Sequence, residues 1–231
     1  MSLFYRAMTG AMRGALLLLA RWRVERQGPL PSGPLIIVSN HLSLADPSLL
    51  AASLPRRVRF LAKRELFSIP LVGLAVRLYG AIPLNREAVD RQALAQAEAW
   101  LRAGGALALF PEGTRSRDTI LRQGKPGVGY LALRTGAPLV PVAITGTEAL
   151  LRPWRLLRRP LITVRVGEPF TVGGQVENPQ RQETQACTDA IMVRVAALLP
   201  ENRRGAYQLR TGTAGQKPAL TGAAVPFAKE R

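Results

Sequence analysis

The stretch GPLIIVSNHLSLADP, residues 33–47, decides the fold and contains the only histidine of the chain. Its apolar and mostly β-branched residues 35–38 follow Gly-Pro and predict a buried strand. The proline that closes the stretch disfavours helical geometry at the residue before it and suits the first turn of a helix. We therefore expect a strand, a turn that carries His41, and a helix over residues 47–54 with Asp46 as its N-cap.

His41 and Asp46 are a candidate general base and its orienting group. Histidine titrates near neutral pH and is the usual proton acceptor in catalysis, and a neighbouring carboxylate is the usual group that orients its ring. His41 comes just after the predicted strand, at the sheet edge where open α/β folds bind ligands. The stretch alone is equally consistent with a plain N-cap beside a surface histidine.

Strands and helices alternate from residue 35 to about residue 171. This alternation predicts an α/β fold with a mostly parallel central sheet flanked by helices. Further strands are expected at residues 58–61, 81–84, 106–110, 139–145 and 161–166, and helices at 69–79, 88–103, 126–135 and 180–199. Pro83 places its strand at an end or edge of the sheet.

The N-terminal segment, residues 1–28, is expected to associate with a membrane. Apolar residues from Phe4 to Trp22 recur at helical spacing within residues 2–26, and arginines fall on another face. This pattern suits an amphipathic helix, or a helix pair, in the headgroup region of a bilayer. The alternative is a helix packed on the protein's own core. An α/β domain is expected over 29–200, and a basic, disordered tail over 201–231.

The net charge of +17, from 32 basic and 15 acidic residues, favours a polyanionic partner. No nucleic-acid-binding module is recognisable, so an anionic membrane surface or a phosphorylated substrate is expected and nucleic acid is not. The basic stretch LRPWRLLRR, residues 151–159, is a second candidate membrane contact. The longest apolar run, residues 15–20, is far shorter than the roughly 20 residues that span a bilayer. We expect a peripheral or monotopic protein on the cytoplasmic side of the cell membrane.

Cys187 is the only cysteine. A single cysteine excludes an internal disulfide framework, and one cysteine with one histidine cannot supply a zinc-finger ligand set. We expect Cys187 to be an inert thiol.

A second polar segment, FPEGTRSR at residues 110–117, follows a predicted buried strand directly. Gly113 allows close approach of the backbone to a ligand. Thr114 and Ser116 offer hydroxyls to a phosphate, and Arg115 and Arg117 offer guanidinium groups. Glu112 suits such a pocket only if it orients an arginine or the turn. Alone, the segment is also consistent with a solvated turn.

Four segments of the chain together resemble a known family. They are NHLSLAD at 40–46, GAIPLNR at 80–86, FPEGTRS at 110–116 and VPV at 140–142. In this order they resemble the glycerolipid acyltransferase family, specifically the 1-acylglycerol-3-phosphate acyltransferases. The resemblance covers about residues 30–170, and its first and third motifs are highly specific as a pair.

The resemblance implies transfer of a fatty acyl group from acyl-CoA or acyl carrier protein to the free hydroxyl of 1-acylglycerol-3-phosphate, giving phosphatidic acid. It implies no metal and no cofactor besides the acyl donor, with His41 as general base and Asp46 as its orienting partner. The alternatives are an acyltransferase for a different lyso-lipid acceptor, a hydrolase and, from a different class, a nucleic-acid-binding protein.

The resemblance also assigns substrate-binding residues. Arg86 and Arg115 would hold the acceptor phosphate. The pocket around the phosphate would be shaped by Glu112, Gly113 and Thr114. Pro141 would lie near the acyl-binding face. Two positions depart from the family pattern. Asn85 stands where aspartate is common, and Pro126 stands where a second basic residue is frequent.

Overall fold

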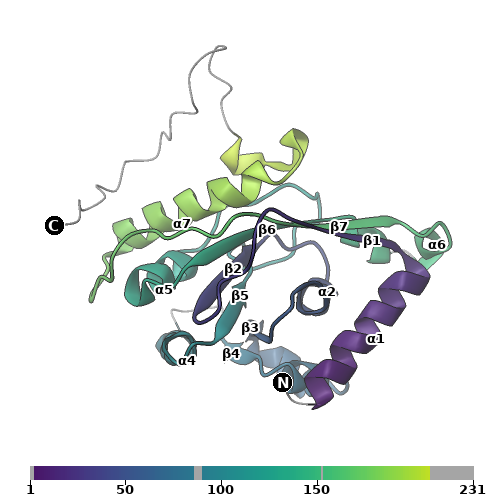
Figure 1. The fold of residues 1–231 in the computed structure, drawn as a ribbon, viewed down its shortest axis with the longest axis horizontal. Coiled ribbons are helices and arrows are strands. Elements are labelled where there is room, and N and C mark those ends of the chain that lie inside the picture. The colour runs from purple at the N-terminus through teal and green to yellow at the C-terminus, as the bar shows by residue number, and fades with distance from the viewer. Residues whose placement is uncertain (1–2, 86–89, 152, 209–231) are drawn as a thin grey trace, which may run out of the picture.

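A central sheet of seven strands organises the residues that the computed structural model describes, namely 3–85, 90–151 and 153–208 (Figure 1). The strand order is β1-β7-β6-β2-β5-β3-β4, and every neighbouring pair is parallel except β6 and β7. The strands are β1 Arg21–Arg26, β2 Leu35–Ser39, β3 Val58–Lys63, β4 Ile82–Leu84, β5 Ala106–Leu109, β6 Leu139–Thr145 and β7 Leu161–Val166. The predicted α/β class and mostly parallel sheet are confirmed.

The middle of the sheet is formed by the most apolar runs of the sequence. β2 lies between β5 and β6, with Val38 opposite Leu109 on one side and Pro141 on the other. All residues of β2 and β5 are buried, as expected of parallel strands covered on both faces. β4, which contains Pro83, is an edge strand as predicted.

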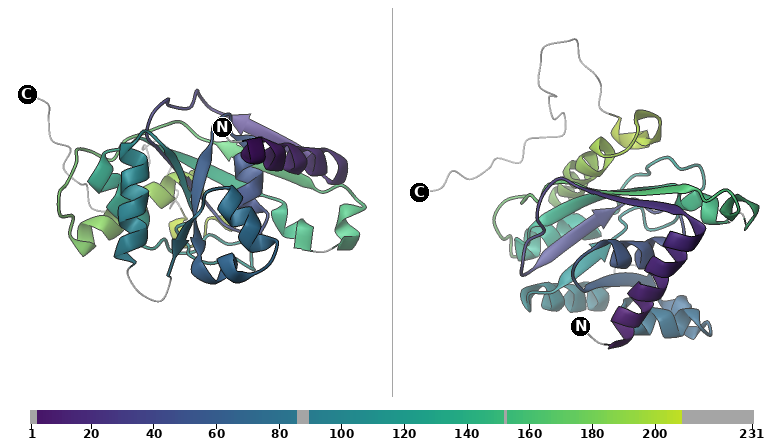
Figure 2. Two further views of the ribbon diagram at one scale, coloured as in Figure 1. Left: turned by 90° about the horizontal axis from the view of Figure 1, so that it is seen from below. Right: turned by 45° about the vertical axis from the view of Figure 1, so that its right-hand side comes forward.

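Helices cover both faces of the sheet (Figures 1 and 2). Helices α4, α5 and α7 pack on one face, and α1 and α2 pack on the other. The helices are α1 Leu3–Leu19, α2 Asp46–Ser53, α3 Val72–Leu78, α4 Arg91–Arg102, α5 Gly127–Thr135, α6 Pro153–Leu156 and α7 Arg181–Ala197, with 3-10 turns η1 Arg64–Ser68, η2 Thr147–Leu151, η3 Glu201–Arg203 and η4 Gly205–Tyr207. The predicted helices are therefore present, with ends that differ by a few residues.

The prediction of a helical segment over all of residues 2–26 is wrong. Helix α1 ends at Leu19, and the chain then forms β1, which pairs in parallel with β7. The sequence of β1, RWRVER, alternates in the manner of a strand: Trp22 and Val24 pack on the core, while Arg21 and Arg23 are exposed. An ion pair between Glu25 and Arg165, 2.9 Å long, joins the two strands.

Helix α1 has one face packed on the domain and one face exposed. Tyr5, Thr9 and Leu16 are buried, so this face belongs to the protein's own core. Leu3, Phe4 and Leu18 are exposed by 79%, 62% and 75%. Among the described residues, no helix is both long enough and apolar enough to cross a membrane.

The prediction of a disordered segment is wrong for residues 201–208. Turns η3 and η4 fold back on the domain, and Tyr207 is buried in the core beneath α7. The buried Tyr207 ring, whose hydroxyl finds a hydrogen-bond partner, explains why the otherwise polar residues 201–208 are ordered. Residues 209–231 lie outside the described part of the chain.

Candidate active site

His41 and Asp46 meet at the C-terminal end of β2. The Nδ1 atom of His41 lies 2.8 Å from Oδ2 of Asp46, and both residues are buried. The same oxygen accepts the backbone N–H groups of Leu42 and Ser43, at 2.6 and 2.7 Å. Because Nδ1 faces the carboxylate, Nε2 is the ring nitrogen left to accept a proton from a substrate.

Asp46 is not the N-cap that the sequence suggested. It is the first residue of α2, and Ala45 occupies the N-cap position without a side-chain capping bond. The Asp46 carboxylate instead points back to the turn of residues 41–43, where its donors are the His41 ring and two backbone N–H groups. Asp46 thus fixes both the imidazole and the turn that carries it.

Asn40 fixes the end of β2 just before the histidine, and Phe110 contacts the histidine ring. The Asn40 side chain donates to the backbone C=O of Ile144 and accepts from its N–H, at 2.9 and 2.8 Å, and so ties the end of β2 to β6. The Phe110 ring stacks on the imidazole with centroids 4.4 Å apart. Neither role was assigned from the sequence, although each residue belongs to a motif quoted there.

Glu112 connects the two predicted motifs through the backbone. Its Oε1 accepts the N–H of His41 at 2.8 Å, and its Oε2 accepts the N–H of Arg122 at 3.1 Å. Burial raises the pKa of Glu112 to about 7, against the opposing effect of these two N–H donors. The expectation that Glu112 orients a turn agrees with these bonds, which are made to backbone groups.

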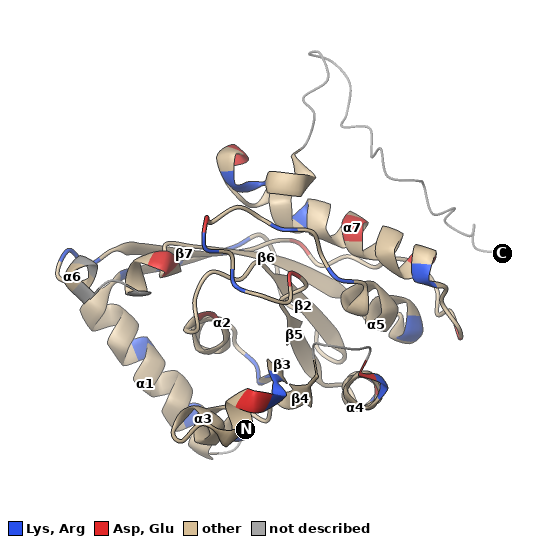
Figure 3. Ribbon diagram, turned by 180° about the vertical axis from the view of Figure 1, so that it is seen from behind, with Lys and Arg blue, Asp and Glu red and all other residues tan. Residues whose placement is uncertain are grey.

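The β5–α5 loop, residues 110–126, contains several basic residues, which colour parts of its ribbon blue in Figure 3. The N–H of Ser116 bonds to the C=O of His41 at 2.8 Å, which places the exposed Thr114 and Arg115 next to the histidine turn. Gly113 has φ +67°, and a Cβ there would lie 2.9 Å from Cε of Lys125. Within the described chain, the Arg115 guanidinium makes no hydrogen bond or ion pair and remains open to an anion.

Two of the predicted substrate residues are not placed at the His41 turn. Arg86 lies outside the described residues, although Asn85 before it is described at the end of β4. Pro141 is buried within β6, and a Cβ on Gly167 would approach both its ring and Leu198. Its position near the acyl-binding face stays a prediction.

Lys63 is a site candidate that the sequence reasoning missed. The strand was expected to end at Leu61, but β3 continues to Lys63. Because β2, β3 and β5 are parallel, Lys63 ends its strand at the same sheet edge as His41. The Lys63 ammonium pairs with Glu65 at 3.1 Å. The signal in the sequence that could have revealed this residue is a lysine directly after the apolar residues 60–62.

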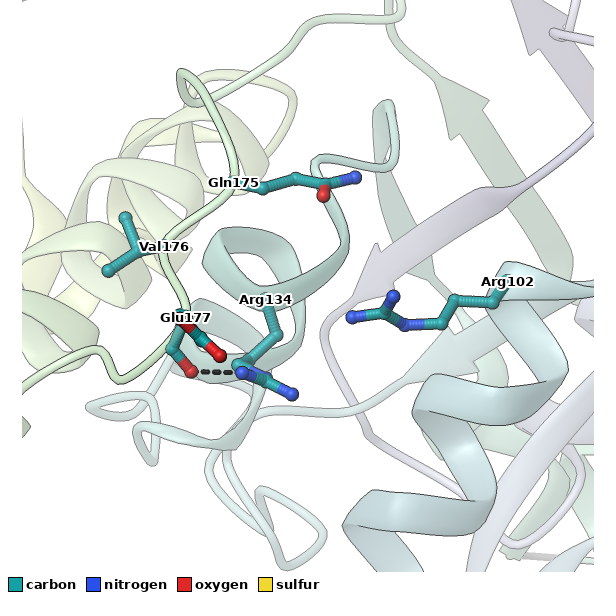
Figure 4. Close-up of a pocket in the computed structure, with 5 residues that line it drawn as sticks. All are labelled: Arg102, Arg134, Gln175, Val176 and Glu177. Atoms are coloured by element: carbon teal, nitrogen blue, oxygen red, sulfur yellow. Dashed lines mark hydrogen bonds between the residues drawn. The ribbon is translucent and has the colours of Figure 1, made fainter.

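A surface hollow lies at the opposite end of the strands and does not contribute to this site (Figure 4). It is lined by Arg102 and Arg134, from the last turns of α4 and α5, and by residues 175–177. Both guanidinium groups pair with Oε1 of Glu98, at 2.7 and 2.9 Å. Their charge is thus partly balanced within the protein.

The potential metal ligands do not form a cluster in the part of the chain that the structure describes. No group of three or more His, Cys, Asp or Glu side chains there is placed to hold a metal ion. Cys187 is buried within α7, and burial raises the pKa of its thiol to about 11. A thiol with so high a pKa is a poor nucleophile near neutral pH.

Comparisons with known proteins identify the family. The chain is 36% identical over 126 residues to a chloroplastic 1-acyl-sn-glycerol-3-phosphate acyltransferase of Brassica napus, covering 53% of this chain and 36% of that protein. It is 26% identical to a 1-acyl-sn-glycerol-3-phosphate acyltransferase of Bacillus subtilis, over 84% of this chain and 96% of that protein. The chain spans about a third to a half of the length of several such relatives.

A solved structure and a family model give the same result. The crystal structure of the 1-acyl-sn-glycerophosphate (LPA) acyltransferase PlsC from Thermotoga maritima matches with a TM-score of 0.64 and 27% identity, over 81% of this chain and 76% of that one. The model of the acyltransferase family matches residues 21–145, which is more than half of the chain and includes His41, Asp46 and Glu112. The chain therefore belongs to the acyltransferase family.

Proposed function

We propose that this protein transfers a fatty acyl group from acyl-CoA or acyl carrier protein to the free hydroxyl of 1-acylglycerol-3-phosphate, giving phosphatidic acid for phospholipid synthesis. The observation that carries the proposal is the buried contact of 2.8 Å between His41 and Asp46, with an open arginine on the adjacent loop. The names of the relatives, which are 1-acyl-sn-glycerol-3-phosphate acyltransferases, support the same acceptor.

The proposed reaction is a direct transfer. Nε2 of His41 removes the proton from the acceptor hydroxyl, whose oxygen attacks the thioester carbonyl. The tetrahedral intermediate then collapses and expels the thiolate of the acyl donor. This thiolate accepts the proton from the imidazolium, so that His41 returns to its neutral form. Asp46 keeps the ring in the tautomer with its proton on Nδ1 and stabilises the imidazolium while it exists.

The acceptor is proposed to bind through its phosphate. Arg115 is exposed one residue before Ser116, whose N–H bonds to the backbone of His41. A guanidinium offers two parallel N–H donors to a phosphate, and holding the phosphate there would position the hydroxyl for attack. Arg86 is proposed as a second phosphate ligand, and Glu112, Gly113 and Thr114 as the wall of this pocket.

The lipid substrate requires access to a membrane surface, and we propose a peripheral position on the cytoplasmic side of the cell membrane. The exposed face of α1 supports this, and so do Trp154 and Leu157, which are 65% and 87% exposed. Arg159 bonds to the backbone of Leu17 at 2.6 Å, so the last residues of the basic stretch adjoin the end of α1, next to α6 (Figure 1). Anionic lipids of the cytoplasmic leaflet attract such arginine-rich surfaces.

The deciding experiment supplies purified protein with labelled acyl-CoA and a panel of acceptors. Lysophosphatidate is expected to be acylated fastest, followed by lysophospholipids with blocked phosphates, and a monoacylglycerol slowest. Release of free fatty acid without transfer would indicate the hydrolase instead. Equal rates with all acceptors would contradict recognition of the phosphate.

A further inference from the structure

The second half of the β5–α5 loop, which includes Leu121 and Gly124, is held by the segment that follows α7. The C-terminal segment, residues 199–208, follows α7 and crosses this loop. The backbone N–H of Leu121 donates to the C=O of Arg203 at 2.9 Å, and the N–H of Ala206 donates to the C=O of Leu121 at 3.4 Å. Leu121 itself is buried.

Tyr207 adds a side-chain bond to the same loop. Its hydroxyl accepts the N–H of Gly124 at 2.9 Å and donates to Oδ1 of Asp189, on α7, at 2.8 Å. Burial raises the pKa of Tyr207, so the phenol keeps its proton at neutral pH and continues to donate to Asp189. The hydroxyl therefore connects the loop to the body of the domain.

Two glycines permit these close contacts. Gly205 has φ +51°, and a Cβ there would lie 2.2 Å from the carbonyl oxygen of Leu121. A Cβ on Gly124 would lie 2.8 Å from the methyl group of Thr188 on α7. The backbones of the segment and the loop therefore approach each other so closely that only glycine fits at these positions. An incidental surface contact would not need such close packing.

The first half of the loop, which includes Glu112 and Ser116, is anchored at the His41 turn. Ser116 bonds to the C=O of His41, and the N–H of Arg122 bonds to Glu112. Arg115 therefore lies on a loop that is tied to the histidine turn at one side and to the C-terminal segment at the other. A loop ordered before the ligand arrives loses less conformational entropy on binding.

We propose that residues 201–207 act as a latch that orders the β5–α5 loop for binding of the phosphorylated acceptor, with Tyr207 and Arg203 as positioning residues. The inference rests on the proposed function for its effect on the acceptor. Arg203 contributes from its side chain as well, because its guanidinium pairs with Glu148 of η2 at 2.9 Å. The latch therefore joins η2, α7 and the loop.

The variant Tyr207→Phe tests the latch, because it keeps the buried ring and removes only the hydroxyl. Hydrogen exchange of the substrate-free protein is expected to accelerate in peptides that cover residues 120–125 and to stay unchanged in α4. The KM for lysophosphatidate is expected to rise about three- to tenfold, the worth of one hydrogen bond. The KM for acyl-CoA and kcat are expected to change less than about twofold. Tyr130→Phe, on α5, is the matched control.

A second pair of variants guards against a folding defect in the first. Arg203→Gln breaks the pair with Glu148 and is expected to act in the same direction, while Arg203→Lys restores most of the wild-type KM. Unchanged exchange of residues 120–125 in Tyr207→Phe would overturn the latch. So would a rise of both KM values together, or faster exchange without any change in the KM for lysophosphatidate. A wild-type protein that fails to acylate lysophosphatidate refutes the proposed function and the acceptor part of the latch, whereas the exchange experiment judges the contact itself.

Discussion

The Glu112 carboxylate accepts the backbone N–H of His41 at 2.8 Å, across 71 positions of sequence. Its other oxygen accepts the N–H of Arg122 at 3.1 Å. The histidine turn after β2 and the basic loop after β5 are therefore held by one buried side chain. A carboxylate can accept at both oxygens, whereas an amide offers only one acceptor oxygen. This difference explains why a glutamate suits the position.

Glu112 is expected to make stability depend on pH. Burial raises the pKa of Glu112 from 4.5 to about 7, so between these values the native protein holds a proton that the unfolded chain has released. The free energy of unfolding should therefore fall as the pH rises through this window and become level above it. The loss should be of the order of 1–3 kcal/mol. Urea unfolding at pH 5, 6, 7 and 8 measures it, and Glu112→Gln should lack this slope. A parallel slope in the variant would assign the effect to another group.

His41→Ala should lower kcat/KM by ~10²–10⁴-fold, the usual contribution of a general base. The imidazole stacks on Phe110 at the edge of the core, so circular dichroism should still report a folded protein. Transfer of labelled acyl groups to lysophosphatidate is the measurement. Activity within a few-fold of the wild type would refute the base role.

Asp46→Asn and Asp46→Ala should separate orientation from folding. Asn keeps an oxygen for the N–H groups of Leu42 and Ser43 but loses the charge that stabilises the imidazolium, so kcat should fall steeply with little loss of stability. Ala leaves those buried N–H groups without an acceptor and should also lower the free energy of unfolding by about 1–3 kcal/mol. Equal kcat for Asp46→Asn and the wild type would remove Asp46 from the mechanism.

Arg115→Ala should weaken binding of the phosphorylated acceptor. Loss of a charge-assisted contact should raise the KM for lysophosphatidate about tenfold or more and leave the KM for acyl-CoA nearly unchanged. The same measurement on Arg117→Ala, two positions further along the exposed loop, shows whether the effect is specific to Arg115. If activity on a phosphate-free acceptor fell equally, the arginine would have a role other than binding the phosphate.

The central strands and the contact between His41 and Asp46 were predictable from the sequence for a physical reason. β2, β5 and β6 are covered on both faces, so each is a mostly apolar run, and His41 comes shortly after the run of β2. β1 escapes prediction because it is an edge strand with exposed charged residues, and an alternation over only six residues does not distinguish it from the end of the preceding helix.

Long-range contacts account for most of what the sequence did not reveal. The bonds of Asn40 to Ile144 and of Tyr207 to Gly124 join positions 104 and 83 residues apart. No local pattern marks such partners. The N-cap role expected for Asp46 was wrong because three donors in the preceding turn bind its carboxylate, whereas an aspartate before a helix is usually an N-cap.

The membrane role of α1 is best tested on its exposed face. Deleting residues 1–26 would remove β1 and the buried Tyr5 and Leu16, and so would confound membrane binding with unfolding. The double variant Phe4→Ser/Leu18→Ser changes only exposed side chains, and Val176→Ser, beside the remote hollow, is the control.

Binding of this variant to anionic vesicles should fall about tenfold or more, since each apolar side chain contributes free energy in proportion to the area it removes from water. Activity on acceptor in vesicles should fall with it, and activity on a short-chain soluble acceptor should persist. Salt should weaken wild-type binding only in part, because it screens the arginines and leaves the apolar contribution intact. If the variant bound vesicles as tightly as the wild type, membrane contact would have to come from another surface, and α1 would serve only to cover the sheet.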